Sequence, residues 1–165
     1  MANLARHLRG VARAATRRRV APRDGALPRL RFAYPNTGAA TRYRVDHSIE
    51  EARIAGMDAE AVSITDATRS YDLSRIDLLV LYRMPLAPRT LALLLAARRW
   101  RIPVVFDCDD LVWDARLRQF EAYDRFYNHD TIRQLMRTSR KVAALMRRVN
   151  ALTLSTDYLA AQAAL

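Results

Sequence analysis

The chain has 165 residues, of which 51% are hydrophobic; this is enough for one domain with a sizeable core and excludes a disordered chain. Its longest apolar runs are far too short to cross a bilayer, and no apolar stretch follows the basic N-terminus. We therefore expect neither a membrane span nor a secretory signal, and a cytoplasmic protein. The single cysteine, Cys108, excludes an internal disulfide, and no Cys/His cluster has zinc-site spacing, so we expect no metal.

The net charge of +11 is concentrated at the N-terminus. Residues 1–31 hold nine Arg against one Asp, which places +8 of the total there and leaves the remaining chain mildly basic. We interpret residues 1–28 as a basic, disordered leader and linker, either an anchor for an anionic surface or a segment without a role. Lys141 is the one lysine among 28 basic residues. This skew is typical of a GC-rich coding sequence, so we expect no nucleic-acid partner.

From residue 29 onward, apolar runs of strand length alternate with segments of helical periodicity. Strands are predicted over residues 30–34, 61–64, 76–82, 102–106 and 151–154. Helices are predicted over residues 41–55, 88–100, 113–127 and 130–149, and from residue 158, after a capping segment at 155–157. This alternation predicts an α/β fold over residues 29–165, a Rossmann-like, doubly wound parallel sheet of about five strands. Because the last helix has little room before Leu165, we expect the front part of a longer protein.

The most informative motif is the run 103–114, in which an apolar strand leads into three carboxylates: Asp107, Asp109 and Asp110. Aspartate is costly to bury unpaired, so the three predict a solvated crevice at the carboxyl end of the strand, where open α/β sheets bind ligands. There they could accept hydrogen bonds from sugar hydroxyls, or one could act as a general base. An Asp-x-Asp metal site and a cap for the following helix are the alternatives.

A second candidate site follows the first strand. The loop carries Asn36, Thr37 and Gly38, and the helix after it begins with Arg42 and Arg44. Backbone N–H groups at a helix start favour an anion, so these residues could line the crevice and meet a phosphate or a carboxylate, or simply face solvent. The spacing is neither a dinucleotide fingerprint nor a P-loop.

Arg83 ends the third predicted strand and should point into the same crevice. A structural ion pair with Asp107 on the neighbouring strand is the alternative hypothesis.

The predicted helix 130–149 has two faces. Apolar residues form an expected core face at Ile132, Leu135, Met136, Val142, Ala143, Met146 and Val149. Basic residues dominate the other side, and they suggest either an ordinary solvated face or a patch for anionic lipid headgroups, made of Arg133, Arg137, Arg140, Lys141 and Arg148.

Two family resemblances arise from these motifs. Locally, the run 104–114 is similar to the Phe-Asp-x-Asp signature of haloacid-dehalogenase-like phosphatases, but that motif lies on the first strand of its domain. The order of four segments over residues 29–165 resembles the amino-terminal domain of GT-B-fold, retaining, family-4-like glycosyltransferases. These segments are Tyr-Arg-Val at 43–45, Leu-Tyr-Arg-Met-Pro at 81–85, the Asp-rich run at 104–114 and Leu-Thr-Leu-Ser-Thr-Asp-Tyr-Leu at 152–159.

The glycosyltransferase resemblance implies one half of a GT-B fold, the domain that binds a glycan or lipid-linked acceptor. It implies no cofactor, and a nucleotide-sugar donor bound mainly by a second domain that this chain lacks. It also implies polysaccharide biosynthesis and peripheral contact with the inner face of the cell membrane. On this basis Asp107, Asp109 and Asp110 are candidate base or acceptor contacts, and the chain alone should turn over no nucleotide sugar. A stand-alone glycan- or partner-binding module without catalysis is the alternative, and a haloacid-dehalogenase-like phosphatase that uses Asp107 and Asp109 is a less favoured one.

Overall fold

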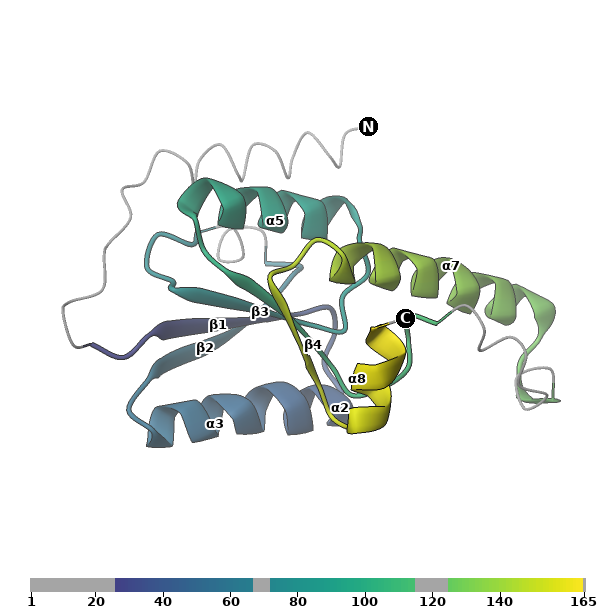
Figure 1. Cartoon of the computed structure of the whole chain (residues 1–165), viewed down its shortest axis with the longest axis horizontal. Helices are drawn as coiled ribbons and strands as arrows, with labels where there is room; N and C mark the ends of the chain where they lie inside the picture. Colours follow the sequence, from purple (N-terminus) through teal and green to yellow (C-terminus); the bar gives the residue numbers. More distant parts are fainter. Residues whose placement is uncertain (1–25, 67–71, 115–124, 165) are drawn as a thin grey trace.

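The protein is described by a computed structural model covering residues 26–66, 72–114 and 125–164. Its centre is a parallel sheet of five strands in the order β2-β1-β3-β4-β5 (Figure 1). The strands are β1 Arg29–Tyr34, β2 Asp58–Ser63, β3 Leu78–Tyr82, β4 Val104–Cys108 and β5 Ala151–Leu154. The predicted α/β class and the five-stranded parallel sheet are confirmed.

Helices cover both faces of the sheet (Figure 1). One face is covered by a continuous helical segment made of α2 Ala39–Thr41, the π-helical turn η1 Arg42–Asp46 and α3 His47–Ile54. The opposite face is covered by α5 Pro88–Trp100 and α7 His129–Met146, and α8 Asp157–Ala163 follows β5. This two-sided cover is the doubly wound arrangement expected for parallel strands.

The core is divided in two by the sheet, because successive side chains of a strand point to opposite faces. On β4, Val104, Phe106 and Cys108 belong to the larger cluster, together with α5 and α7. On β3, Val80 and Tyr82 belong to the smaller cluster beneath η1 and α3. The face of β4 opposite Phe106 therefore also lies under η1, and this is the face that carries Asp107.

Several predicted boundaries differ from the observed ones. β4 runs two residues further than expected, to Cys108, so Asp107 lies within the strand and not beyond its tip. β3 begins at Leu78 and not at residue 76, because Asp77 is held at the amino edge by the backbone and guanidinium of Arg29. The helix predicted over 113–127 falls mostly outside the described residues. At its start, Trp113 lies in a turn and Asp114 has no regular secondary structure.

Helix ends follow the expected capping chemistry. The side chain of Thr156 accepts a hydrogen bond from the backbone N–H of Leu159, which confirms the predicted cap before α8. Asn128 caps α7 in the same way. Gly56 follows α3 with a positive φ of 82°, a conformation that glycine adopts without strain.

Candidate functional site

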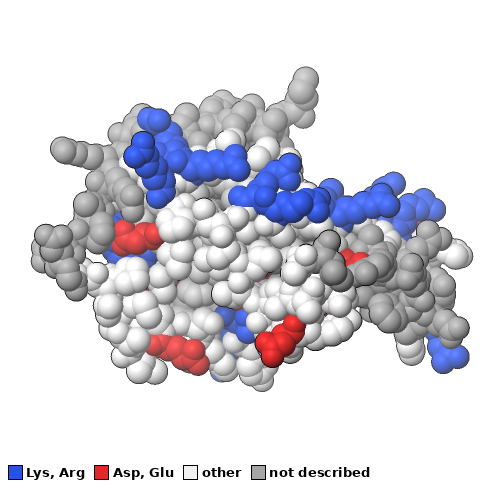
Figure 2. All heavy atoms as spheres, viewed as in Figure 1, with Lys and Arg blue, Asp and Glu red and all other residues white. Residues whose placement is uncertain are grey.

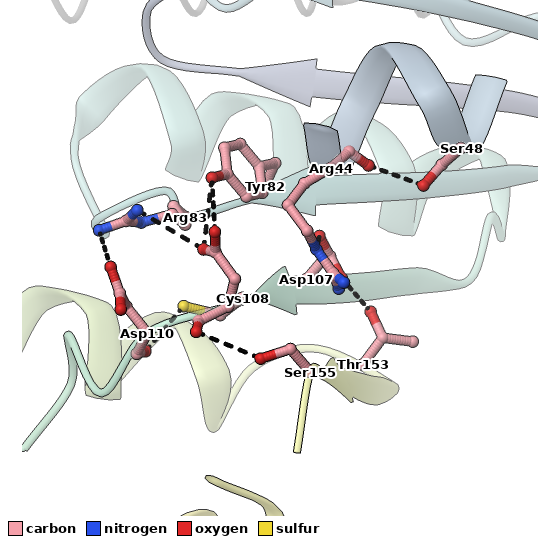
Figure 3. A network of polar contacts seen from close by, with 10 residues as sticks. Arg44, Ser48, Tyr82, Arg83, Asp107, Cys108, Asp110, Thr153 and Ser155 are labelled. Carbon is pink, nitrogen blue, oxygen red and sulfur yellow. Dashed lines mark hydrogen bonds and ion pairs between the residues drawn. The ribbon is translucent and has the colours of Figure 1, made fainter. Parts of the chain in front are cut away.

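The carboxyl edge of the sheet brings together most of the predicted site residues, but in unequal roles (Figure 3). Asp107 is only 5% exposed, which contradicts the expectation that all three carboxylates mark a solvated crevice. Asp109 follows β4 with a half-buried side chain, and the side chain of Asp110 is 63% exposed. Asp107 can be buried because its carboxylate is ion-paired, and a buried carboxylate is tolerated when it is fully hydrogen-bonded.

The Asp107 carboxylate accepts three hydrogen bonds from two residues. The Arg44 guanidinium donates from Nε to Oδ2 at 3.2 Å and from its second nitrogen to Oδ1, a two-point contact that fixes both groups. The Thr153 hydroxyl, one strand away on β5, donates to Oδ1 at 2.7 Å. The hydrogen bond to Asp107 raises the pKa of Arg44 above its ordinary value, against the opposing effect of burial. This cluster therefore joins β4, β5 and the first helix.

The π-helical turn η1 determines which arginine reaches Asp107. The His47 N–H bonds to the Arg42 carbonyl five residues back, so this turn holds one residue more than an α-helical turn. Arg44 faces the sheet and Arg42 is exposed. The sequence predicted that Arg42 or Arg44 meets an anion or that both face solvent. Arg44 meets the carboxylate of Asp107, which the protein itself supplies, and Arg42 has no part in the network.

Arg83 has the least common backbone conformation in this region. Its φ is 46°, in the left-handed region that non-glycine residues rarely adopt, while its N–H still pairs with the Asp107 carbonyl at 2.9 Å. From there the guanidinium extends past the end of β4, 3.0 Å from Asp110 and 3.5 Å from Asp109. The alternative pairing of Arg83 with the Asp107 carboxylate is therefore wrong. Strained residues of this kind are concentrated at functional sites.

Tyr82 completes the contacts of Asp109. Its hydroxyl lies 3.3 Å and 3.4 Å from the two carboxylate oxygens, so Asp109 is held between Tyr82 and Arg83. Burial raises the pKa of Tyr82, so this hydroxyl stays protonated and can donate. Sequence reasoning missed Tyr82 and Thr153. Their positions at the carboxyl ends of β3 and β5, in register with Asp107, are the signal that could have found them.

The loop after β1 lies at the same edge of the sheet. Asn36, Thr37 and Gly38 are exposed, and the Thr41 hydroxyl holds the loop by donating to the Asn36 carbonyl at 2.8 Å. Gly38 has an extended backbone, and a Cβ at this position would meet nothing within 4 Å. Neither backbone strain nor crowding in the protein therefore requires glycine here.

Two grooves with apolar walls flank the edge, each about 220 Å³. One reaches Arg83 and is bordered by Val112 and by residues of α7, among them Leu135 and Met136. The other lies beside Pro35 and Met84. Within the described ranges, no group of three or more His, Cys, Asp or Glu residues could hold a metal ion. The capping role considered for Asp109 and Asp110 concerns the helix predicted over 113–127, most of whose residues fall outside those ranges.

Cys108 lies between the two carboxylate sites but faces the core. It is fully buried and its Sγ–H donates to the Asp110 carbonyl at 3.1 Å. Burial raises the pKa of the thiol to about 11, so the thiolate is scarce at neutral pH.

A thiol reagent should therefore modify Cys108 only when the protein opens. We expect reaction with an aromatic disulfide at pH 8 to be much slower in the native protein than in denaturant. The raised pKa also means that the contribution of Cys108 to stability is complete below its ordinary pKa of 9.0 and is lost as the pH rises through about 11. Equal reaction rates in the native and the denatured state would contradict this assignment.

The basic face predicted on α7 is exposed, and the core face is only partly as predicted. Arg133, Arg137, Arg140 and Lys141 are exposed, as is Arg148 just beyond the helix. Ile132 and Val142 are buried as expected, joined by Ser139 and Leu145. Leu135 was assigned to the core but is exposed and borders the groove near Arg83. Among the residues described, no helix is both long and apolar enough to cross a bilayer.

No protein-family model matches this sequence, and neither does any curated protein.

Proposed function

We propose that residues 29–165 form the acceptor-binding domain of a glycosyltransferase of the GT-B type. The observation that carries this proposal is that the three carboxylates lie in different environments. Asp107 is fully occupied by Arg44 and Thr153, whereas Asp109 and Asp110 lie beyond the strand and keep oxygens open to solvent. Carboxylates that reach solvent and are held in place by an arginine suit the hydroxyl groups of a sugar, which donate hydrogen bonds.

The surroundings of these carboxylates support an acceptor with a polar and an apolar part. Hydroxyl groups would bind at Asp109 and Asp110, and the loop 36–38 would close the other side. The groove beside Arg83, with Leu135 and Met136 on its wall, could hold an apolar portion such as that of a lipid-linked glycan. In this proposal the nucleotide-sugar donor binds to a second domain, and the exposed basic residues of α7 contact anionic lipid at the inner membrane face.

The geometry favours a phosphatase much less. A nucleophilic carboxylate needs a free oxygen aimed at the phosphorus atom. Both oxygens of Asp107 accept hydrogen bonds from side chains, and the residue is buried. Asp107 is therefore better suited to joining β4 to β5 and to the first helix than to attacking a substrate.

The proposal can be tested by screening the full chain on an array of mono- and oligosaccharides, free and lipid-linked. We expect saturable binding to a subset of glycans, weakened about tenfold by Asp110→Ala because one charge-assisted hydrogen bond is lost. The matched control is Asp130→Ala, which removes one carboxylate that is 90% exposed on α7 and should leave binding unchanged.

Two results would count against an acceptor site. One is the absence of any bound glycan at high protein concentration. The other is equal binding by the wild-type protein and the Asp110→Ala variant. Binding without any transfer from nucleotide sugars, even after the protein is supplied with a donor-binding domain, would favour a stand-alone glycan-binding module.

A further inference from the structure

A second concave surface lies at the amino edge of the sheet, away from the proposed acceptor site. It is a pocket of about 420 Å³ between the end of α5, the start of β4 and the connection from α7 to β5. Three arginines line it, Arg98, Arg101 and Arg148, together with Asn150 and apolar residues. No carboxylate contributes to this wall, and no described acidic residue forms an ion pair with any of the three arginines.

The fold itself brings these arginines together. In a parallel sheet the flanking helices run against the strands, so α5 and α7 both end at the amino edge. Arg101 follows α5 in the left-handed conformation, with φ at 54°, and its N–H bonds to the Arg98 carbonyl at 3.1 Å. Asn150 is fixed from the other side, because its Oδ1 accepts from the Val104 N–H at 2.8 Å. The pocket therefore has a defined backbone frame.

The favourable interaction of arginines with helix C-termini explains only part of the positive charge in this pocket. Each helix C-terminus carries about half a negative charge, so two ends offset roughly one arginine. Arg148 also donates to the Ala144 carbonyl, which occupies one of its nitrogens. Two further exposed arginines, Arg99 and Arg147, lie next to the pocket residues in the sequence. The pocket thus keeps a strong positive excess. Figure 2 shows Lys and Arg as a band over α5 and α7.

We propose that this pocket binds a phosphate group, either free, as in a diphosphate, or on a lipid headgroup. Guanidinium groups offer paired donors that match phosphate oxygens, and three arginines that line one concave pocket bring such donors closer together than scattered surface charges do. The pocket lies at the start of β4 and Asp109 follows the end of the same strand, so the two are about 17 Å apart. The pocket is therefore distinct from the proposed acceptor site, and the two proposals do not depend on each other.

The test is a titration of the full chain with inorganic pyrophosphate at low salt, followed by calorimetry and by the Nε–Hε resonances of the arginines. We expect saturable binding that shifts the resonances of Arg98, Arg101 and Arg148. The double variant Arg98→Gln/Arg148→Gln should bind at least about tenfold more weakly. The matched control is Arg137→Gln/Arg140→Gln, which removes two charges from α7 outside the pocket and should stay within about twofold of the wild-type protein.

Equal weakening in both double variants would overturn the proposal, because it would show a general charge effect. Unchanged binding in Arg98→Gln/Arg148→Gln would overturn it as well. If that variant does not fold, Arg101→Asn replaces it, since asparagine tolerates the left-handed backbone, and the same loss is expected. Vesicles of phosphatidylglycerol in phosphatidylcholine separate the two sources. A loss of vesicle binding that is larger in the pocket variant than in Arg137→Gln/Arg140→Gln identifies a headgroup in the pocket, and retained vesicle binding with loss of pyrophosphate binding identifies a free phosphate ligand.

Discussion

Replacing Asp107 with alanine should lower the free energy of unfolding by about 3 kcal/mol, because the charge of Arg44 would remain half-buried without its partner. The Thr153 hydroxyl would lose its acceptor as well. For a chain of this length, 1 kcal/mol corresponds to about 2–4 °C in the midpoint of thermal unfolding. Urea denaturation of the full chain, followed by circular dichroism, measures the effect directly.

The interpretation of that loss depends on two companion variants. Asp110→Ala removes an exposed carboxylate from the same segment and should change the stability by no more than about 0.5 kcal/mol. Arg44→Met combined with Asp107→Leu removes both charges, and this double variant should be more stable than Asp107→Ala alone. If Asp107→Ala and Asp110→Ala proved equally mild, the Arg44–Asp107 pair would have no structural role.

Truncation of Phe106 to alanine should have the largest effect, a loss of about 4 kcal/mol. Phe106 is the largest of the fully buried side chains and is the middle residue of β4, on the face covered by α5 and α7. Removing its ring leaves a cavity that close-packed neighbours can fill only in part. Chemical denaturation gives this value, and a reduced slope in denaturant would indicate loss of cooperative unfolding.

A control for the Phe106 variant is available on the adjacent strand. Leu152 is the register partner of Phe106 on β5, yet it is partly exposed at the edge of the sheet. Leu152→Ala should therefore cost much less, about 1 kcal/mol or below. A loss of the same size at both positions would mean that β5 is covered to the same extent as β4, contrary to the described packing.

The fold could be predicted from the sequence because its strands are short apolar runs separated by helices. Residues 30–34, 102–106 and 151–154 are each recognisable as strands, and their alternation with helices leaves a parallel sheet as the simplest solution. Strand ends were less predictable. The pattern of apolar residues ends at Phe106, but the ladder continues to Cys108, because Arg44 neutralises the carboxylate that interrupts the pattern and Thr153 donates a hydrogen bond to it.

The site could be located from the sequence, but its pairings could not be deduced. Asp107, Arg44 and Arg83 were all recognised as candidates, since each lies at the carboxyl end of a strand or at the following helix start. The alternative pairing of Arg83 with Asp107 was wrong, because the left-handed backbone of Arg83 directs its side chain past β4. Such a conformation at a non-glycine residue has no clear local signal in sequence. Arg44 was separated from Asp107 by 63 residues.

The π-helical turn makes chain length, and not only residue type, a determinant of the Asp107 cluster. Deleting one residue from η1 would allow the helix to close with ordinary α-helical winding. Everything before the deletion would then rotate by about 100° relative to α3. The loop 36–38 and Arg42 would change their orientation, or Arg44 would leave Asp107, although every remaining residue was retained. A homologue one residue shorter in this segment would therefore need a different cation for its buried carboxylate, a dependence that scanning substitutions alone would never reveal.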